Sequence, residues 1–342
     1  MNTLALTDIC TPGQRRQLSK KDLTEHGYPV YGANGIIGYY TAYNQEKPII
    51  TIAGRGNSCG AVHITQPYSY VTANALCLEN LRADIDLEYL YFFLKQYDFS
   101  ALISGAAQAQ LTVKQLRAVQ IPYYPYSRQK EIASVLKKAE QCIELRREQI
   151  KLLDTLKSAH FSEVMAKLKN TGKLTSYPLE RVATIQCGKR NANEAVSDGK
   201  YPFFTCAKSP RRINSWQFNC ECVLVSGNTD FHVQYYKGQF DAYQRIYIIE
   251  AADKNATSVP FLYEYMQYCL PELQKQAIGG VMPYLKREML TKLPILLPAL
   301  QEQRKIIATI RKMQQTKANA LKALAQEKLL FTKLLHQYFG EV

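Results

Sequence analysis

Two glycine-containing stretches carry side chains able to hydrogen-bond to nucleic-acid bases. They read AGRGNSCG at 53–60 and SGNTDFHVQ at 226–234. The polar side chains are Arg55, Asn57 and Ser58 in the first, and Asn228, Thr229, His232 and Gln234 in the second. Arginine pairs best with guanine, asparagine and glutamine pair with adenine, and serine and threonine accept either. Because glycine permits sharp turns and close approach, the stretches predict base-contacting loops, with an ordinary solvated turn as the alternative.

Basic side chains in predicted loops are suited to holding phosphate groups. They are Arg15, Arg16, Lys189, Arg190, Lys208, Arg211 and Arg212. The last three form the densest basic cluster, and the whole chain has a net charge of +14. Such a charge attracts polyanions, so nucleic acid is the first partner expected; a solvated basic face is the alternative.

A third candidate is YGANGIIGYY at 31–40, which has the composition of a glycine-rich hairpin. Its Tyr31, Asn34 and Tyr39 are of types that enter a DNA groove. A purely structural hairpin explains the stretch equally well.

Catalytic chemistry has little support in the sequence. The chain contains neither an Asn-Pro-Pro-Tyr tetrapeptide nor a G-x-x-x-x-G-K-[ST] phosphate loop, and the glycines of 53–60 miss dinucleotide spacing. The five histidines lie in no recognisable nucleophile signature. Cys220 and Cys222 have the wrong interval for zinc. We therefore expect no catalytic residue, no metal site and no cofactor bound by this chain, and we expect reduced cysteines.

The elements that must position these loops occur twice along the chain. Leu6 aligns with Leu179 and Gly54 with Gly227, each 173 positions later, while Lys130 aligns with Lys305 after small gaps. A long internal repeat of this kind indicates one scaffold used twice. Short β-branched and aromatic runs predict a small sheet in each half, with a helix before a proline-containing strand.

Each half ends in a long helical pattern. In the second half, hydrophobic spacing of three and four residues predicts a coiled-coil seam. The positions expected to pair are Ile307, Ile310, Leu321, Leu324, Phe331 and Leu335, with Ile132, Val135, Leu153 and Leu156 in the first half. About 40 helical residues span roughly 60 Å, longer than a domain of this size. We therefore expect the two helices to project and to pair antiparallel.

The predicted fold class is α+β, with two tandem α/β domains, each followed by a long helix, and the two helices packed as an antiparallel coiled coil. The expected boundaries are a first domain at 1–126, a central helix at 127–172, a second domain at 173–300 and a final helix at 301–342. The length of 342 residues suits two domains. With neither a signal-peptide pattern nor a stretch of roughly 20 apolar residues, a cytoplasmic location and no membrane partner are expected.

This organisation resembles the specificity subunit of type I restriction-modification systems over essentially the whole chain. The resemblance rests on the paired openings LTDICTPGQRRQLSKKDLTEHGYPVYG and LERVATIQCGKRNANEAVSDGKYPFFT. It also rests on the paired closings, in which Pro122 with Gln129, and Pro294 with Gln303, mark the proline strand and the helix start.

The resemblance implies a DNA-reading subunit without chemistry of its own. Each domain would read one half of a split, asymmetric double-stranded target, with an unread spacer between the halves. Two methyltransferase subunits would supply S-adenosylmethionine and methylate adenine, and restriction/translocase subunits using ATP and Mg would cleave. Two alternatives are a specificity subunit of another multi-subunit DNA modification system, and a coiled-coil scaffold that binds RNA or acidic proteins.

Overall fold

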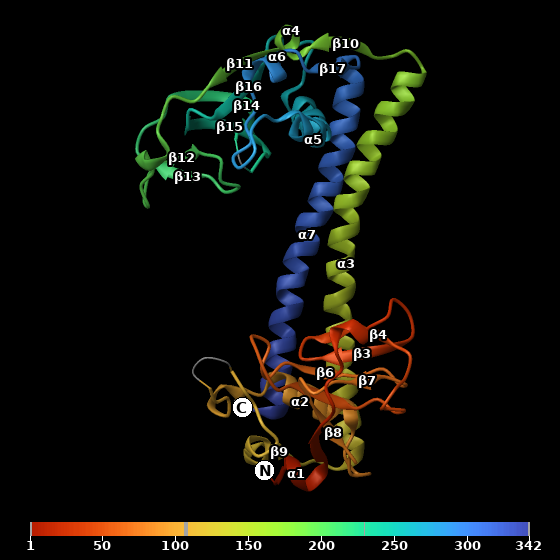
Figure 1. Ribbon diagram of the computed structural model, residues 1–342. Coiled ribbons are helices and arrows are strands. Elements are labelled where there is room, and N and C mark those ends of the chain that lie inside the picture. The colour runs from red at the N-terminus through yellow and green to blue at the C-terminus, as the bar shows by residue number, and fades with distance from the viewer. Residues whose placement is uncertain (1, 106–108, 229, 341–342) are drawn as a thin grey trace. The chain divides into compact units, whose positions relative to one another are not determined.

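The computed structural model describes residues 2–105, 109–228 and 230–340. It contains two compact units, Met1–Glu148 with Lys322–Val342, and Gln149–Leu321. The boundary between the units crosses both long helices, α3 (Tyr126–Asn170) and α7 (Leu300–Phe339). Each unit therefore consists of one globular part and one end of each long helix (Figure 1).

The first unit contains a four-stranded sheet in the order β2-β8-β5-β6 and a three-stranded sheet in the order β4-β3-β7. A third pairing joins β1 to β9 in antiparallel register. The strands are β1 (Thr3–Ala5), β2 (Thr11–Gln14), β3 (Tyr28–Gly32), β4 (Gly35–Tyr40), β5 (Ile50–Ala53), β6 (Val62–Ile64), β7 (Tyr70–Val71), β8 (Ala75–Glu79) and β9 (Gln120–Pro122). The helices besides α3 are α1 (Leu6–Ile9), α2 (Leu87–Gln96), and the 3-10 turns η1 (Lys20–Asp22), η2 (Phe99–Ala101) and η3 (Gln115–Ala118).

The second unit contains one six-stranded sheet in the order β11-β16-β14-β15-β12-β13, and β10 pairs with β17. Its strands are β10 (Thr175–Pro178), β11 (Ala183–Cys187), β12 (Tyr201–Phe204), β13 (Arg211–Ile213), β14 (Phe218–Ser226), β15 (Val233–Ala242), β16 (Ile246–Ala251) and β17 (Pro294–Leu297). Its helices besides α7 are α4 (Leu179–Val182), η4 (Ala192–Glu194), α5 (Val259–Gln276) and α6 (Arg287–Thr291). The strand order matches that of the first unit, with β6 and β7 together in the place of β15. The sheet of the first unit is therefore divided between β6 and β7.

The repeat extends to single hydrogen bonds. Leu6 donates its backbone N–H to Val119, and Leu179 donates equivalently to Leu293. Gln129 and Gln303 are both fully buried at the first turn of a long helix. Each accepts a backbone N–H from the residue that caps α2 or α5, Asp86 at 2.9 Å and Ser258 at 2.8 Å. The same buried amide therefore fixes the long helix to the globular part in each unit.

The long helices pack side by side in opposite directions. In the first unit the Tyr124 hydroxyl donates to Tyr338, and Arg146 pairs with Glu327 at 2.8 Å. In the second unit Lys317 pairs with Asp154 at 2.6 Å. As residue numbers rise along α3 they fall along α7, which confirms the predicted antiparallel pair (Figure 1).

Burial along the long helices differs from the predicted seam at three positions. Val135, Leu156 and Leu321 are 39%, 51% and 48% exposed, so their predicted pairing is wrong. The neighbouring Leu136 and Ala320 are buried instead. Ile132, Ile307 and Ile310 are buried in the cores of their own units, and the remaining seam positions Leu153, Leu324, Phe331 and Leu335 are half-buried. At Val135 and Leu321 the buried position thus lies one residue away from the predicted one.

Among the described residues, none of the helices is both long and apolar enough to span a membrane.

Candidate nucleic-acid interface

In the first unit, the glycine loop lies between two other segments. The backbone N–H of Gly54 donates to Asn74 at 3.0 Å, and the Gly54 carbonyl accepts from Leu111 at 2.9 Å. Ser58 donates its hydroxyl to Ala33 at 3.5 Å, which brings the loop against the β3–β4 turn. Arg55, Asn57 and Asn34 are exposed around this junction. The structure therefore gathers four of the predicted base-contacting residues on one surface of the first unit.

The second unit repeats the junction with different side chains. Gly227 donates to Arg245 at 2.8 Å and accepts from Leu285 at 2.8 Å. The thiol of Cys206 donates to the Asn228 side chain at 2.6 Å, and Gln234 donates to the Lys208 carbonyl at 2.6 Å. The loop after β12 thus lies against the β14–β15 turn, so Lys208, Asn228 and Gln234 come together. Thr229 lies outside the described residues.

His232 also belongs to the β14–β15 turn. Its backbone N–H donates to the Ser226 hydroxyl at 3.2 Å, and its Nδ1 lies 2.8 Å from the Asp230 carbonyl oxygen. The ring is half-buried. These contacts fix the orientation of the imidazole. The predicted contact with a base would therefore involve Nε2.

The three candidate residues of the β3–β4 hairpin differ in their exposure to solvent. Tyr31 is 5% exposed and accepts the Gln66 backbone N–H at 3.0 Å through its hydroxyl, so the prediction that it enters a groove is wrong. The physical reason is that the ring packs in a buried hydrophobic cluster with Val71, Ala75 and Cys77. Asn34 and Tyr39 remain exposed.

The basic residues predicted to contact phosphate differ in whether they already bond to other groups of the protein. Arg190 donates to Asp241 at 3.1 Å, to Glu194 at 3.0 Å and to Ser215 at 2.9 Å, and Asp241 is fully buried. An arginine that balances a buried carboxylate is held in place by it, so Arg190 stabilises the fold, and its phosphate contact stays a prediction.

Three further arginines interact with acceptor groups of the protein itself. Arg15 is ion-paired with Glu79, and Arg212 donates to the carbonyls of Gly199 and Lys200 at 2.9 and 3.2 Å. Arg211 approaches the Ala192 carbonyl at 3.4 Å. Arg16, Lys189 and Lys208 are exposed, and their phosphate role stays a prediction.

An exposed cluster of tyrosines lies on the first unit and escaped the sequence analysis. The rings of Tyr28 and Tyr43 meet edge to face with centroids 5.0 Å apart, and Tyr43 meets Tyr68 at 5.3 Å. Tyr68 has a φ of +52°, which a non-glycine residue rarely adopts. The sequence contains 24 tyrosines. Because most tyrosines in any protein line the core, the sequence alone does not show which of them are exposed.

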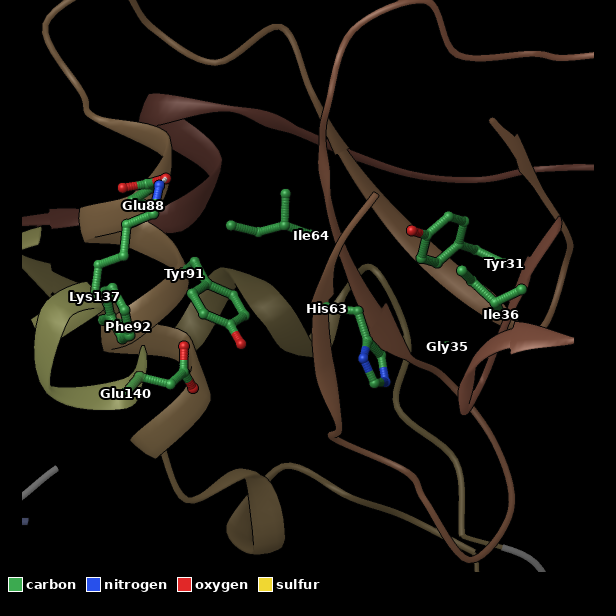
Figure 2. A pocket seen from close by; sticks show the side chains of 10 residues that line it. All are labelled: Tyr31, Gly35, Ile36, His63, Ile64, Glu88, Tyr91, Phe92, Lys137 and Glu140. Carbon is green, nitrogen blue, oxygen red and sulfur yellow. Dashed lines mark hydrogen bonds and ion pairs between the residues drawn. The ribbon is translucent and has the colours of Figure 1, made fainter. Parts of the chain in front are cut away.

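A cavity of about 400 Å³ lies between the β3–β4 hairpin, β6, α2 and α3 of the first unit (Figure 2). Its titratable side chains are mostly paired, since Lys137 bonds Glu88 and Lys95 bonds Glu140. Figure 2 shows His63 beside Gly35, across the cavity from these helices. The ion pairs tie α2 to α3, so these groups serve the attachment of the long helix.

The corresponding positions in the second unit line a cavity of about 280 Å³. Tyr263, Arg311 and Gln314 there replace Tyr91, Lys137 and Glu140 of the first cavity. Within the described ranges, no group of three or more His, Cys, Asp or Glu side chains is arranged to hold a metal ion.

Two exposed turn residues next to the glycine loops were also missed. Asn74 and Arg245 fall within the β-branched and aromatic runs YVTANALCLE and AYQRIYIIE, whose composition is typical of strands. In the structure β8 begins at Ala75 and β16 at Ile246, so each residue lies in the turn immediately before a strand. The polar residues interrupting each apolar run were the available signal.

Comparisons with known proteins agree with the repeated architecture. A family model described as the type I restriction modification DNA specificity domain matches residues 1–155 and again 173–327. The EcoDI type I restriction enzyme specificity subunit of Escherichia coli is 35% identical over 144 residues, 41% of this chain and 32% of that protein. The chain therefore matches about a third of the length of this relative.

A putative type I restriction enzyme specificity subunit of Haemophilus influenzae is 25% identical over 314 residues, covering 84% of this chain and 80% of that protein.

Solved structures share the fold at low sequence identity. The type I restriction-modification S subunit of M. genitalium superposes with a TM-score of 0.70 at 17% identity, covering 99% of this chain and 96% of that one. A chain from a study of complex assembly and conformational transition in a type I system gives 0.59 at 18% identity, covering 100% and 98%. With the family model matching both halves and most of the sequence, the chain belongs to the type I restriction modification DNA specificity family.

Proposed function

We propose that this chain recognises double-stranded DNA at a target with two parts, one part bound by each unit. The observation that carries this proposal is the repeated junction at Gly54 and Gly227, where one backbone arrangement presents different exposed side chains. A constant scaffold with variable polar residues is the arrangement expected of two readers that share an ancestor. The net charge of +14 supplies the attraction for the phosphate backbone.

The two parts of the target differ in sequence under this proposal. The first junction offers Arg55, Asn57 and Ser58, whereas the second offers Asn228, His232 and Gln234. Because side-chain type decides which base edge is bound, unlike sets select unlike half-sites. The target is therefore asymmetric.

The long helices set the number of unread base pairs between the half-sites. α3 has 45 residues and α7 has 40, and neither contains proline. A helix of 40 residues is about 60 Å long, and B-DNA rises about 3.4 Å per base pair. A spacer of constant length follows from helices of constant length.

Partner subunits carry the chemistry. The helices expose apolar side chains, Leu145, Leu329 and Leu330 in the first unit and Leu152, Leu156 and Leu321 in the second. Exposed leucines on helices are a common docking surface. We place two adenine-methyltransferase subunits on them, with restriction/translocase subunits joining that complex. The partners bring S-adenosylmethionine, ATP and Mg, and this chain contributes recognition without a catalytic group.

Mapping adenine methylation at single-base resolution tests this function. A host lacking other methyltransferases would express the chain together with its candidate methyltransferase partner. The expected result is methylation confined to a two-part sequence with a spacer of fixed length. The partner expressed alone is the control and should leave that sequence unmodified. Methylation at one short uninterrupted site, or at the same sites without this chain, would refute the proposal.

A further inference from the structure

Asn74 and Arg245 occupy the same position in the two units. In the first unit, Ala75 donates its N–H to the Thr72 carbonyl at 3.2 Å, which closes a turn immediately before β8. In the second unit, Ile246 donates to Tyr243 at 2.8 Å and closes the corresponding turn before β16. Asn74 and Arg245 are the third residues of these four-residue turns.

The glycine of each loop is hydrogen-bonded to this turn. The turn therefore lies close to the residue that follows the glycine. Gly54 and Gly227 donate to the carbonyls of Asn74 and Arg245, as described above. A Cβ atom at Gly227 would lie 2.7 Å from the Arg245 carbonyl oxygen, a distance that side-chain carbons do not adopt. Only glycine permits this approach at position 227. A Cβ atom at Gly54 would lie at an ordinary contact distance, 3.7 Å from the Asn74 carbonyl oxygen. The pairs Arg55 with Asn74, and Asn228 with Arg245, are therefore fixed as neighbours by the backbone.

The two pairs contain the same residue types in exchanged places. The first unit has arginine after the glycine and asparagine in the turn, whereas the second has asparagine after the glycine and arginine in the turn. Arginine and asparagine are the side chains that form two simultaneous hydrogen bonds with guanine and adenine, respectively.

The side chains of Asn74 and Arg245 are exposed, and neither makes a hydrogen bond or ion pair with the residues that the structure describes. Arg212 and Arg190 differ, because their guanidinium groups donate to protein acceptors.

We propose that Asn74 and Arg245 are specificity-determining residues, with Asn74 contacting an adenine in one half-site and Arg245 a guanine in the other. Each acts beside the residue after the glycine, so that one unit contacts at least two bases through this junction. The inference rests on the proposed function, since it assumes that these surfaces face DNA.

The test uses the assembled complex of full-length chain and methyltransferase partner on a plasmid library randomised across the wild-type target. Sequencing the methylated molecules gives the preference at every base. Arg245→Ala should reduce discrimination at one guanine of one half-site by about tenfold or more and leave the other half-site unchanged. Asn74→Ala should do the same at one adenine of the other half-site. Arg304→Ala and Asn2→Ala, exposed positions of the same two units, are the matched controls and should change no preference.

Arg245→Gln provides a gain-of-preference measurement that does not depend on lost activity. It should move the preference at the affected position from guanine toward adenine. Unchanged discrimination in all three variants would overturn the inference, and so would a uniform loss across all sequences. Failure of the wild-type complex to select a two-part target would instead refute the proposed function, so the two failures are distinguishable.

Discussion

At the scale of single residues, Arg55 is the side chain whose role is easiest to isolate. It is exposed on the Gly54 loop, and its backbone is bridged to Gln110. Truncation to alanine therefore removes the guanidinium and leaves the loop conformation in place. We predict that Arg55→Ala loses about 1–3 kcal/mol of discrimination at one base of one half-site. Binding of the full chain to a panel of single-base target variants measures this.

Arg16 serves as the comparison for Arg55. It is also exposed in the first unit, but its predicted partner is phosphate. Arg16→Ala should weaken binding to every DNA equally and reduce the salt dependence of the binding constant. If Arg55→Ala behaves like Arg16→Ala, then Arg55 contacts the backbone and reads no base.

His63 makes the stability of the first unit depend on pH. Its Nε2 atom is buried without a hydrogen-bond partner in the described structure, and burial together with the nearby Lys95 lowers the pKa of the imidazole. The unfolded chain titrates near the ordinary value of about 6.5. Between that value and the lower folded pKa, the unfolded chain binds more protons, so this contribution to stability is present above about pH 6.5 and is lost on acidification.

Replacement of His63 removes this pH dependence. We predict that His63→Gln shows a smaller loss of unfolding free energy between pH 7.5 and pH 5.5 than the unchanged chain does. Urea denaturation at the two pH values is the measurement. An identical loss in both proteins would show that other groups dominate acid sensitivity.

At the scale of elements, the buried glutamine amides decide how firmly each long helix is attached. The Gln303 amide accepts from Ser258 at 2.8 Å and donates to Ala256 and Pro298 at 2.9 and 2.8 Å. Ser258 caps α5 without a side-chain bond of its own, so Gln303 reinforces that helix end. Leucine at 303 would leave these backbone groups buried and unpaired.

We predict that Gln303→Leu lowers the unfolding free energy by about 2–5 kcal/mol, because each buried unpaired group costs about 1–3 kcal/mol. Gln301, exposed on the same helical turn, is the matched control, and Gln301→Leu should change stability by less than about 0.5 kcal/mol. Equal effects of the two substitutions, measured by chemical denaturation, would contradict the proposed attachment.

The elements themselves were largely predictable from the sequence. The repeat, the position of each long helix and the antiparallel pairing follow from ordered matches and helical periodicity. The register of the helix seam was not predictable from the sequence. Apolar residues occupy adjacent positions at Val135 and Leu136, and at Ala320 and Leu321. Only the packing of each helix against its own unit decides which neighbour is buried.

The candidate site was predictable in location and less so in detail. The glycine loops were found because glycine beside polar residues is a local signal. The partners of individual side chains are not local: Arg190 donates to Asp241, and the Tyr31 hydroxyl accepts from the Gln66 backbone N–H. Asn74 and Arg245 were overlooked because a single polar residue inside an apolar run does not reveal where the strand begins.

At the scale of the whole molecule, the internal repeat gives one chain two units built on the same scaffold. Both units retain the buried glutamine, the paired terminal strands and the glycine junction, while the exposed side chains at that junction differ. Attachment is therefore common to the two units, and under the proposed function recognition is individual to each. The helices belong to both units, since each unit includes one end of each.

The central claim is that the helix pair converts its own length into a number of unread base pairs. Removing Arg147–Leu153 from α3 and Ala320–Gln326 from α7 takes seven residues from each helix between the Arg146–Glu327 and Asp154–Lys317 pairs. A deletion of seven residues preserves the apolar seam and shortens the pair by about 10 Å, or roughly three base pairs.

Adenine-methylation mapping of this shortened chain with its partner is the most direct measurement. The account predicts the same two half-sites with a spacer about three base pairs shorter. An active complex that keeps the original spacer would contradict it.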